Sequence, residues 1–442
     1  MSQQHMHAQT HSPRSVAVVG AGLAGLSAAL HLIKHGHHVT LYEAAPQAGG
    51  RARGVSMTHA MLDNGQHLCL GAYQATLQLL AQAGLTEQGV FLRLPLALYM
   101  HDGAQRMSLV TSRYLPAPLH LVWGLCTAQG LSGKSKWRAL SWMLQLRRKH
   151  FQLQQDMTVA DLLTDAKQTA QSIRWLWEPL CLAALNTPIT QASGQVFLHV
   201  LRDSFQYRRS DSDFLIVRQD LTSGLIQPLL QHIIRAGGQC QLHATVSKIA
   251  PYGEGAQVYT ANDMTTFDAV IVAVGPHQLK TIEMPRLPQL SHFSYQPITT
   301  IYMQFSADFR LPYPVMGLCH GLAQWVFDRG QCCAQPGLLA FVISAHDSLP
   351  SDKATLIQQC ITALNLSLKT YGMQLPETPA WSQIITEKRA TFSCNKGLER
   401  PASDLGYPQL FIAGDYVAGD YPATIEGAVR SGMQAAEYCL AH

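Results

Sequence analysis

Charged side chains are scarce in this sequence. Asp, Glu, Lys and Arg make up 14% of the 442 residues, whereas hydrophobic residues make up 47%. Soluble domains hold about a quarter charged residues, so this composition favours a large core, an apolar ligand cavity or a membrane-facing patch. The formal net charge is only +4, from 32 basic and 28 acidic side chains. This net charge is too weak to argue for nucleic acid, and the sequence shows no aromatic-plus-basic recognition module, so we expect no nucleic-acid partner.

The sequence also lacks paired cysteine motifs. Its 10 cysteines are scattered, without CxxC or zinc-type spacing, and the adjacent Cys332 and Cys333 have poor geometry for a mutual disulfide. We therefore expect reduced thiols, a cytoplasmic location and no metal site. His5, His7 and His11 in the polar N-terminal stretch 1–14 offer a metal site in principle, but a disordered segment is the simpler interpretation.

No apolar stretch is long enough to span a bilayer. The segment most suited to a lipid surface is 115–151, in which basic residues flank an apolar helical face. A basic amphipathic helix can lie on a membrane, which would place the protein peripherally on the inner face of the cytoplasmic membrane. A helix packed on the protein body with a solvated rim explains the pattern equally well. The basic residues are Lys134, Lys136, Arg138, Arg147, Arg148 and Lys149.

A strand, a glycine-rich turn and a helix follow one another near the N-terminus. Residues 16–19 form a short apolar run, the right length for a buried parallel strand. Residues 20–25 read GAGLAG, a GxGxxG motif, and residues 26–35 favour a helix. Residues 39–42 predict a second strand that ends at Glu43, where a carboxylate can accept both ribose hydroxyls of an adenosine. Together these features predict a dinucleotide-binding βαβ unit.

The motif glycines have distinct physical roles. Gly20 permits the tight turn, Gly22 lets the backbone approach a pyrophosphate, and Gly25 lets helix and strand pack closely. The N-terminus of the helix that follows offers free N–H groups and the positive end of its dipole to the phosphates, and Leu23 and Ala24 are predicted to bind the cofactor together with the motif glycines.

Residues 49–51, Gly-Gly-Arg, follow shortly after Glu43. They are similar to the GGR element that extends this fingerprint in the amine oxidase and phytoene desaturase group of flavoproteins. The resemblance implies FAD rather than NAD, with Gly50 and Arg51 at the FAD pyrophosphate. The alternative is an ordinary surface arginine in a glycine loop.

The C-terminal end carries a second element of this kind. Residues 410–413 predict a short strand, Gly414 and Asp415 follow, and a helix is expected from Thr424 onward. The resemblance implies that Gly414 and Asp415 hold the ribityl–phosphate region. It also implies that the helix, at Thr424 and Ile425, directs its N-terminus toward the flavin, where its dipole favours negative charge. A helix that simply closes the sheet is compatible with this role.

Two strand-like stretches lie between these ends, at 242–249 and 267–274, and the second is expected to be a central strand near the cofactor. In the resembled fold, Val246 offers backbone contacts to adenine. The predicted fold class is therefore α/β, with a Rossmann-like FAD-binding domain of the GR2 type and an inserted α+β substrate domain. The FAD domain is expected to be discontinuous, at 14–75, 206–285 and 396–442, with the mostly helical 76–205 and the sheet-containing 286–395 forming the substrate domain.

Nearly the whole chain resembles the hydroxysqualene dehydroxylases, also called squalene-associated FAD-dependent desaturases. The segments 62–67 and 324–330 are the most particular to that family, and the remaining ones are shared more widely. One departure is Val217, where a proline is expected before Arg218, and it weakens the prediction for that loop. The matching segments are 62–67, 71–73, 177–180, 185–188, 324–330, 388–392 and 421–432.

The resemblance implies reduction of hydroxysqualene to squalene in squalene and hopanoid biosynthesis. The substrate would be a small isoprenoid whose allylic hydroxyl leaves as water after protonation, with hydride arriving from reduced flavin in an apolar tunnel. The sequence holds no convincing second GxGxxG motif for NAD(P)H. The electron donor is therefore unknown and could be a diffusible reductant or a redox partner.

Asp63 and His67 are the first candidates for the general acid, because they lie in the family-specific segment that follows the GGR element. The simpler interpretation is that Asp63 bonds backbone in a turn signalled by Asn64-Gly65 and that His67 is a core histidine. Tyr73 is a secondary candidate, as are Asp328 and Arg329, which are alternatively an internal ion pair with each other.

Other functions stay open at this stage. A carotenoid or apocarotenoid desaturase would move hydride from the substrate into FAD, the opposite direction. A flavin-dependent isomerase or cyclase would consume no reductant, and an FAD-binding scaffold in an isoprenoid complex would catalyse nothing. An amine oxidase is less favoured, because the sequence shows no aromatic cage for an amine.

Overall fold

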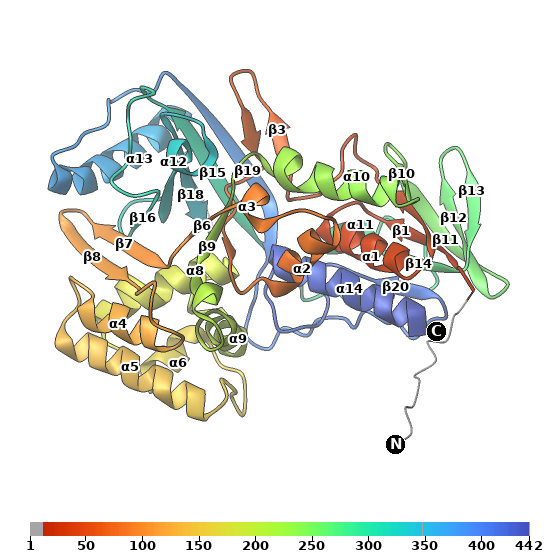
Figure 1. Ribbon diagram of the computed structural model, residues 1–442, viewed down its shortest axis with the longest axis horizontal. Coiled ribbons are helices and arrows are strands. Elements are labelled where there is room, and N and C mark those ends of the chain that lie inside the picture. The colour runs from red at the N-terminus through yellow and green to blue at the C-terminus, as the bar shows by residue number, and fades with distance from the viewer. Residues whose placement is uncertain (1–11, 347, 442) are drawn as a thin grey trace.

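The computed structural model describes residues 12–346 and 348–441. His5, His7 and His11 lie outside the described residues. The chain forms two large sheets flanked by helices, with one sheet at each end of the long axis (Figure 1).

A parallel five-stranded sheet carries the N-terminal motif. Its strand order is β10-β2-β1-β14-β20, and every neighbouring pair runs parallel. The sheet thus takes strands from the front, the middle and the end of the chain. The strands are β1 (Ser15–Val19), β2 (His38–Tyr42), β10 (Gln239–Gln241), β14 (Ala269–Val272) and β20 (Leu410–Ile412).

Two helices pack side by side on this sheet (Figure 1): α1 (Leu23–Lys34) and α14 (Ile425–Ala441). They approach so closely that a Cβ at Gly432 would lie 2.0 Å from the carbonyl oxygen of Ala24. The Ser27 hydroxyl also donates to the carbonyl of Val429 at 2.9 Å. Both predicted helices are therefore present, and they bring the two ends of the chain together.

The two central strand predictions are wrong in their bounds. Residues 242–245 are not a strand, because His243 has a φ of +56° that turns the chain before β11 (Val246–Tyr252). The apolar run 267–274 is divided between β13 (Met264–Phe267), which pairs with β12 (Gly255–Thr260), and β14. Asp268 separates them because its backbone N–H and carboxylate both bond Ser15.

A second, seven-stranded sheet is mostly antiparallel, with the order β19-β15-β18-β17-β16-β7-β8. One face packs against α13 (Lys353–Leu368) through Val326 and its neighbours, and the other face carries Trp325 and Phe327, because side chains alternate along a strand. The strands are β7 (Ala97–Asp102), β8 (Gln105–Val110), β15 (Tyr295–Gln304), β16 (Val315–Leu318), β17 (Trp325–Asp328), β18 (Leu338–Ser344) and β19 (Trp381–Phe392).

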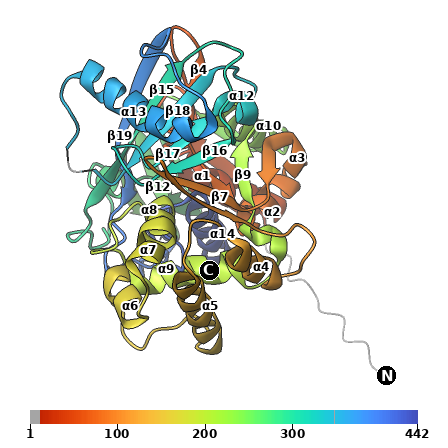
Figure 2. The ribbon, with the colours of Figure 1, turned by 90° about the vertical axis from the view of Figure 1, so that its left-hand side faces the viewer.

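Helices gather below this second sheet in Figures 1 and 2. The segment 115–151 holds two helices that pack against each other, and the second carries the predicted apolar face with its basic flanks. The helices are α4 (Leu119–Thr127), α5 (Gly133–Arg148), α6 (Val159–Asp165), α8 (Glu178–Leu185) and α9 (Gly194–Phe205). Across residues 12–346 and 348–441, every helix falls short of the length or apolar character needed to cross a bilayer.

Short elements join the two sheets. The strand β9 (Phe214–Val217) pairs with β5 (Cys69–Leu70) and β6 (Phe91–Leu94), outside the parallel sheet. The predicted domain boundaries stay a prediction. The mixed architecture with its Rossmann-like parallel sheet confirms the predicted α/β class. The other short elements used below are β3 (Gly54–Ser56), β4 (Met61–Asp63), α2 (Gln74–Gln82), α3 (Glu87–Val90), η2 (Arg209–Ser212), α11 (Pro276–Leu279) and α12 (Arg329–Cys333).

Candidate active site

A cavity of about 630 Å³ runs between the parallel sheet and the second sheet. This volume falls within the range of about 300–1,000 Å³ that ligand sites occupy. All predicted cofactor positions line it except Gly25. Those that do are Gly20, Gly22, Leu23, Ala24, Glu43, Gly50, Arg51, Val246, Gly414, Asp415, Thr424 and Ile425.

The glycines at the start of α1 form an open cradle. Gly20 has a φ of +106°, and a Cβ there would lie 2.6 Å from the carbonyl oxygen of Ala273. Gly25 does not face the cavity, because a Cβ there would lie 1.9 Å from the Gly20 carbonyl oxygen, so it serves helix–strand packing. A Cβ at Gly22 would instead meet no atom within 4 Å. The space before the α1 N-terminus is thus free for an anionic group.

Charged side chains flank this cradle. The Glu43 carboxylate is fixed at the end of β2, accepting from the backbone N–H groups of Ala21 and Ala45 at 2.9 Å each. Across the cavity, the Arg51 guanidinium donates to Asp415 Oδ1 at 2.7 Å and to the Ala390 carbonyl at 2.8 Å. The front and the end of the chain therefore meet here as an ion pair.

The N-terminus of α14 also opens on the cavity. The Thr424 hydroxyl accepts from the backbone N–H of Gly427 at 3.0 Å, which caps the helix. A 17-residue helix ending at the cavity presents partial positive charge there. The donor and charge set around the cavity, with open space at Gly22, fits a dinucleotide.

The first predicted acid, Asp63, does not line the cavity. The residue is 4% exposed, and its carboxylate accepts from Arg329 Nη1 at 3.0 Å and from the backbone N–H of Leu221 at 2.7 Å. Arg329 is fully buried and also donates to Gln66 and Gln335. Because both oxygens of Asp63 are engaged away from the cavity, the geometry favours a structural role for Asp63.

His67, the second predicted acid, does line the cavity. Its Nδ1 lies 2.7 Å from the Gly65 carbonyl oxygen, which can only accept, so Nδ1 carries a proton and Nε2 is left for a ligand. Burial lowers the pKa of His67 below its ordinary value of 6.5, against the opposing effect of the Asp63 carboxylate. The imidazole is therefore mainly neutral near pH 7.

The loop 64–67 that carries His67 is held by the second sheet. The Asn64 amide donates to Glu387 Oε2 at 3.0 Å, and the Gln66 backbone N–H donates to the Thr300 hydroxyl at 3.2 Å. The Tyr302 hydroxyl donates to the Asp63 carbonyl at 3.1 Å. The motif pattern did not indicate Thr300, Tyr302 or Glu387, because these residues sit far along the chain within ordinary strand patterns.

The alternative of an internal Asp328–Arg329 ion pair is wrong. Arg329 pairs with Asp63, whereas Asp328 caps α12 by accepting from the backbone N–H of Gln331 at 3.1 Å. Neither residue lines the cavity. Tyr73 does line it, with its ring edge-on to Tyr421 at 6.2 Å, and burial raises the pKa of its hydroxyl.

Beyond the cradle the cavity becomes apolar. Ser212 is a polar residue within this apolar arm, which α8, α9 and the second sheet help to enclose. Charged lining residues on these elements are Asp203 of α9 and Glu387 and Arg389 of β19, whereas the following set is apolar. The arm is lined by Leu96, Leu98, Leu180, Ala184, Phe197, Val200, Leu201, Phe214, Trp325, Phe327 and Val342.

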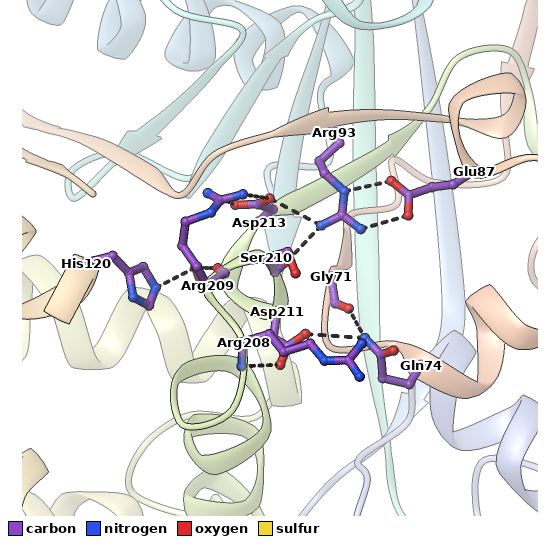
Figure 3. Close-up of polar contacts among 11 residues, drawn as sticks. Gly71, Gln74, Glu87, Arg93, His120, Arg208, Arg209, Ser210, Asp211 and Asp213 are labelled. Atoms are coloured by element: carbon purple, nitrogen blue, oxygen red, sulfur yellow. Dashed lines mark hydrogen bonds and ion pairs between the residues drawn. The ribbon is translucent and has the colours of Figure 1, made fainter. Parts of the chain in front are cut away.

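A partly buried charge network surrounds Asp213, the residue that follows Ser212 (Figure 3). Asp213 accepts from Arg93 at 3.2 Å and from Arg209 at 3.0 Å, and Arg93 also bonds Glu87 at 2.7 Å. The neighbouring Arg218 donates to the carbonyl of Phe91 at 3.2 Å, so the segment with the missing proline continues a regular strand pairing. The network fixes η2 and β9, and with them the position of Ser212 in the cavity wall.

Comparisons with known proteins agree with this geometry. Residues 23–440 match the flavin containing amine oxidoreductase family. A hydroxysqualene dehydroxylase from Sinorhizobium fredii is 29% identical, with 97% of this chain and 99% of that protein covered. A zeta-carotene desaturase from Capsicum annuum is 23% identical, with 96% and 80% covered. The resemblance predicted from motifs is thus confirmed.

Solved structures show the same fold. An oxidoreductase from Methanosarcina mazei superposes with a TM-score of 0.70, covering 96% of this chain and 100% of that one, at 15% identity. The match at that identity concerns the fold alone. With the family match over nearly the whole chain and the cradle built for a dinucleotide, the chain belongs to the flavin containing amine oxidoreductase family and is an FAD-dependent oxidoreductase.

Proposed function

We propose that this enzyme reduces hydroxysqualene to squalene. The observation that carries the proposal is the single cavity, which is lined by the FAD cradle, by a largely apolar arm and by His67. A C30 hydrocarbon needs such an arm, because burying its chain away from water supplies most of its binding free energy. The 29% identity to a hydroxysqualene dehydroxylase over the whole chain supports this substrate rather than an amine.

The cofactor would be held by the residues that line the cradle. The α1 N-terminus with Gly22 receives the pyrophosphate, Glu43 the adenosine ribose, and Val246 the adenine. Gly50 and Arg51 would also contact the pyrophosphate, while Gly414, Asp415 and the α14 N-terminus would hold the ribityl and flavin end; all of them line the cavity. When bound and reduced, FAD supplies the hydride that replaces the lost hydroxyl.

The protein itself binds the substrate, excludes water from it and protonates it. The hydroxyl of hydroxysqualene is allylic, so a proton placed on its oxygen lets the C–O bond break and water leave, with the positive charge shared over the double bond. Hydride addition to that carbon then yields squalene, so one proton and one hydride balance the loss of water. The apolar arm keeps solvent away from the cation.

His67 is the proposed proton donor. Its Nδ1–H is committed to the Gly65 carbonyl, so only the imidazolium can donate, through Nε2. The lowered pKa makes the imidazolium a stronger acid than free histidine, which assists transfer to a weakly basic hydroxyl, at the expense of the protonated fraction at neutral pH. Asp63, held by Arg329, supports the loop and is not the donor.

The second candidate is a carotenoid desaturase, favoured by the 23% identity to a zeta-carotene desaturase across 96% of the chain. It uses the same cradle and the same apolar arm. The two reactions differ in the direction of hydride flow, since a desaturase needs no proton donor for a leaving hydroxyl.

Substituting Gly22 should remove FAD and leave the protein folded. The backbone at Gly22 is extended, with φ −74° and ψ 178°, and a side chain there would enter the cradle without meeting protein atoms. We predict that Gly22→Leu weakens FAD affinity at least about ten-fold, or about 1.4 kcal/mol. The measurement is a flavin titration with circular dichroism as the folding check. Gly419→Leu, also unobstructed but outside the cavity, is the matched control and should bind FAD normally.

His67→Gln should retain FAD yet slow the reaction about 100- to 10,000-fold, the usual contribution of a positioned acid. Because His67 must be protonated and its pKa is below 6.5, the wild-type rate should rise as the pH falls from about 8 to about 5. Above the pKa each pH unit lowers the protonated fraction about ten-fold. Single-turnover rates measure both effects. The assignment would be contradicted if the rate of His67→Gln kept the pH dependence of the wild type, or if the variant His59→Gln, at an exposed histidine, lost as much rate as His67→Gln.

The direct test of the proposed function is anaerobic. The flavin of the purified protein is photoreduced, hydroxysqualene is added, and the flavin spectrum is followed while products are extracted. We expect reoxidation with one squalene formed per flavin. Absence of reoxidation by hydroxysqualene, together with bleaching of the oxidised protein by a more saturated carotenoid precursor, would establish the desaturase instead.

A further inference from the structure

One segment of the chain carries positive charge without any negative charge. Residues 103–155 contain eight Lys or Arg and no Asp or Glu. The whole chain has 32 basic and 28 acidic residues, so the remainder holds 24 and 28 and is net negative. The positive charge of this protein is therefore concentrated in this segment, around α4 and α5. The eight residues are Arg106, Arg113, Lys134, Lys136, Arg138, Arg147, Arg148 and Lys149.

The same segment exposes large apolar side chains. Tyr114 is 87% exposed, Trp137 67% and Trp123 53%. All seven tryptophans lie in the described part of the chain, and only these two are exposed at this level. Leu119 and Leu144, at 52% and 49%, add to the set. A soluble surface has no need for two exposed tryptophans, which points to a contact that covers them.

The exposed side chains lie on helices that are already well packed on their other faces. Trp142 and Leu146 of α5 are only 4% and 5% exposed. The exposure of Trp137 and Leu144 therefore does not reflect a loosely packed helix. The Lys136 ammonium donates to the Cys126 carbonyl at 3.0 Å, which joins the start of α5 to the end of α4. Figures 1 and 2 show both helices together at one end of the molecule, remote from the parallel sheet.

We propose that this surface docks on an anionic lipid bilayer. We name it the α4–α5 surface and define it as Tyr114, Leu119, Trp123, Trp137, Leu144 and the exposed basic residues Arg113, Lys134, Arg147, Arg148 and Lys149. Tryptophan and tyrosine favour the interface between headgroups and acyl chains, where leucine enters the apolar side. Clustered Lys and Arg are attracted to anionic headgroups. Lipid satisfies both features at once, and residues 103–155 contribute no acidic side chain that would repel such headgroups.

The α4–α5 surface is one hydrogen bond away from the cavity wall. His120 of α4 is buried, and its Nε2 lies 3.1 Å from the Ser212 hydroxyl, which lines the apolar arm. Docking through α4 would bring the bilayer, the phase in which a C30 hydrocarbon dissolves, next to that arm. This consequence rests on the proposed function, whereas docking itself does not.

The test uses the full-length, FAD-loaded protein and phosphatidylcholine vesicles with or without phosphatidylglycerol, separated by flotation. We expect binding to the anionic vesicles, at least ten-fold weaker binding to the neutral ones, and weakening by salt because exposed charges are screened. A blue shift of tryptophan fluorescence should accompany binding.

Two sets of variants with matched controls localise the contact. Trp123→Ser with Trp137→Ser, and separately Arg147→Glu with Arg148→Glu and Lys149→Glu, should each reduce binding to anionic vesicles at least ten-fold. The control for the tryptophan variant is Tyr252→Ser with Met264→Ser, two exposed residues on β11 and β13. The control for the charge-reversal variant is Arg235→Glu with Lys353→Glu and Lys369→Glu, three basic residues exposed elsewhere. The controls should bind as the wild type does, and flavin content verifies folding in every case.

Equal binding by the surface variants and the wild type would overturn the proposal, as would equal binding to both vesicle types. Wild-type protein that floats with neither vesicle and forms dimers that Trp123→Ser with Trp137→Ser dissociates would assign the surface to a second copy of the chain. Because vesicle binding is measured without substrate, its failure is distinguishable from failure of the hydroxysqualene assay.

Discussion

The buried ion pair between Asp63 and Arg329 is the interaction on which the arrangement of the site depends. Neither charge can be left alone in the interior without a penalty of about 3–5 kcal/mol, so the two segments that carry them are obliged to meet. Asp63 ends β4 near the start of the chain, and Arg329, 266 residues later, begins α12 directly after β17 of the second sheet. Their pairing, with Gln66 and Tyr302 beside it, anchors the loop that carries His67 in the cavity wall.

Around that anchor, the two ends of the cavity have opposite character. The cradle consists of glycines, two helix N-termini and the Glu43, Arg51 and Asp415 charges, which suits a charged cofactor. The arm beyond it consists of aliphatic and aromatic side chains from α8, α9 and the second sheet. The low fraction of charged residues in the sequence is thus explained by a cavity lined with apolar residues as well as by a large core, and by an exposed apolar surface on α4 and α5.

Local features were predictable from the sequence, whereas long-range pairing was not. The turn at Gly20 and the strand–helix unit follow from residues within about ten positions of each other, and both are present. The partner of Asp63 could not be deduced, because nothing near Asp63 identifies an arginine so distant in sequence. The adjacent Asp328 was a natural but wrong choice for Arg329, since it serves as a helix cap. The predicted strand 267–274 is divided at Asp268. The hydrogen bonds of Asp268 to Ser15 could not be foreseen, because the two residues are 253 positions apart.

The central claim is that one cavity holds the cofactor and a long hydrocarbon side by side. It is tested most directly by titrating squalene into the oxidised, FAD-loaded protein and following the flavin absorbance, with Ala184→Trp, which fills the apolar arm, as the comparison. We expect a saturable spectral change in the wild type and its loss in Ala184→Trp, with FAD content unchanged. A spectrum unaffected by squalene in the wild type, or an equal response in Ala184→Trp, would contradict the shared cavity.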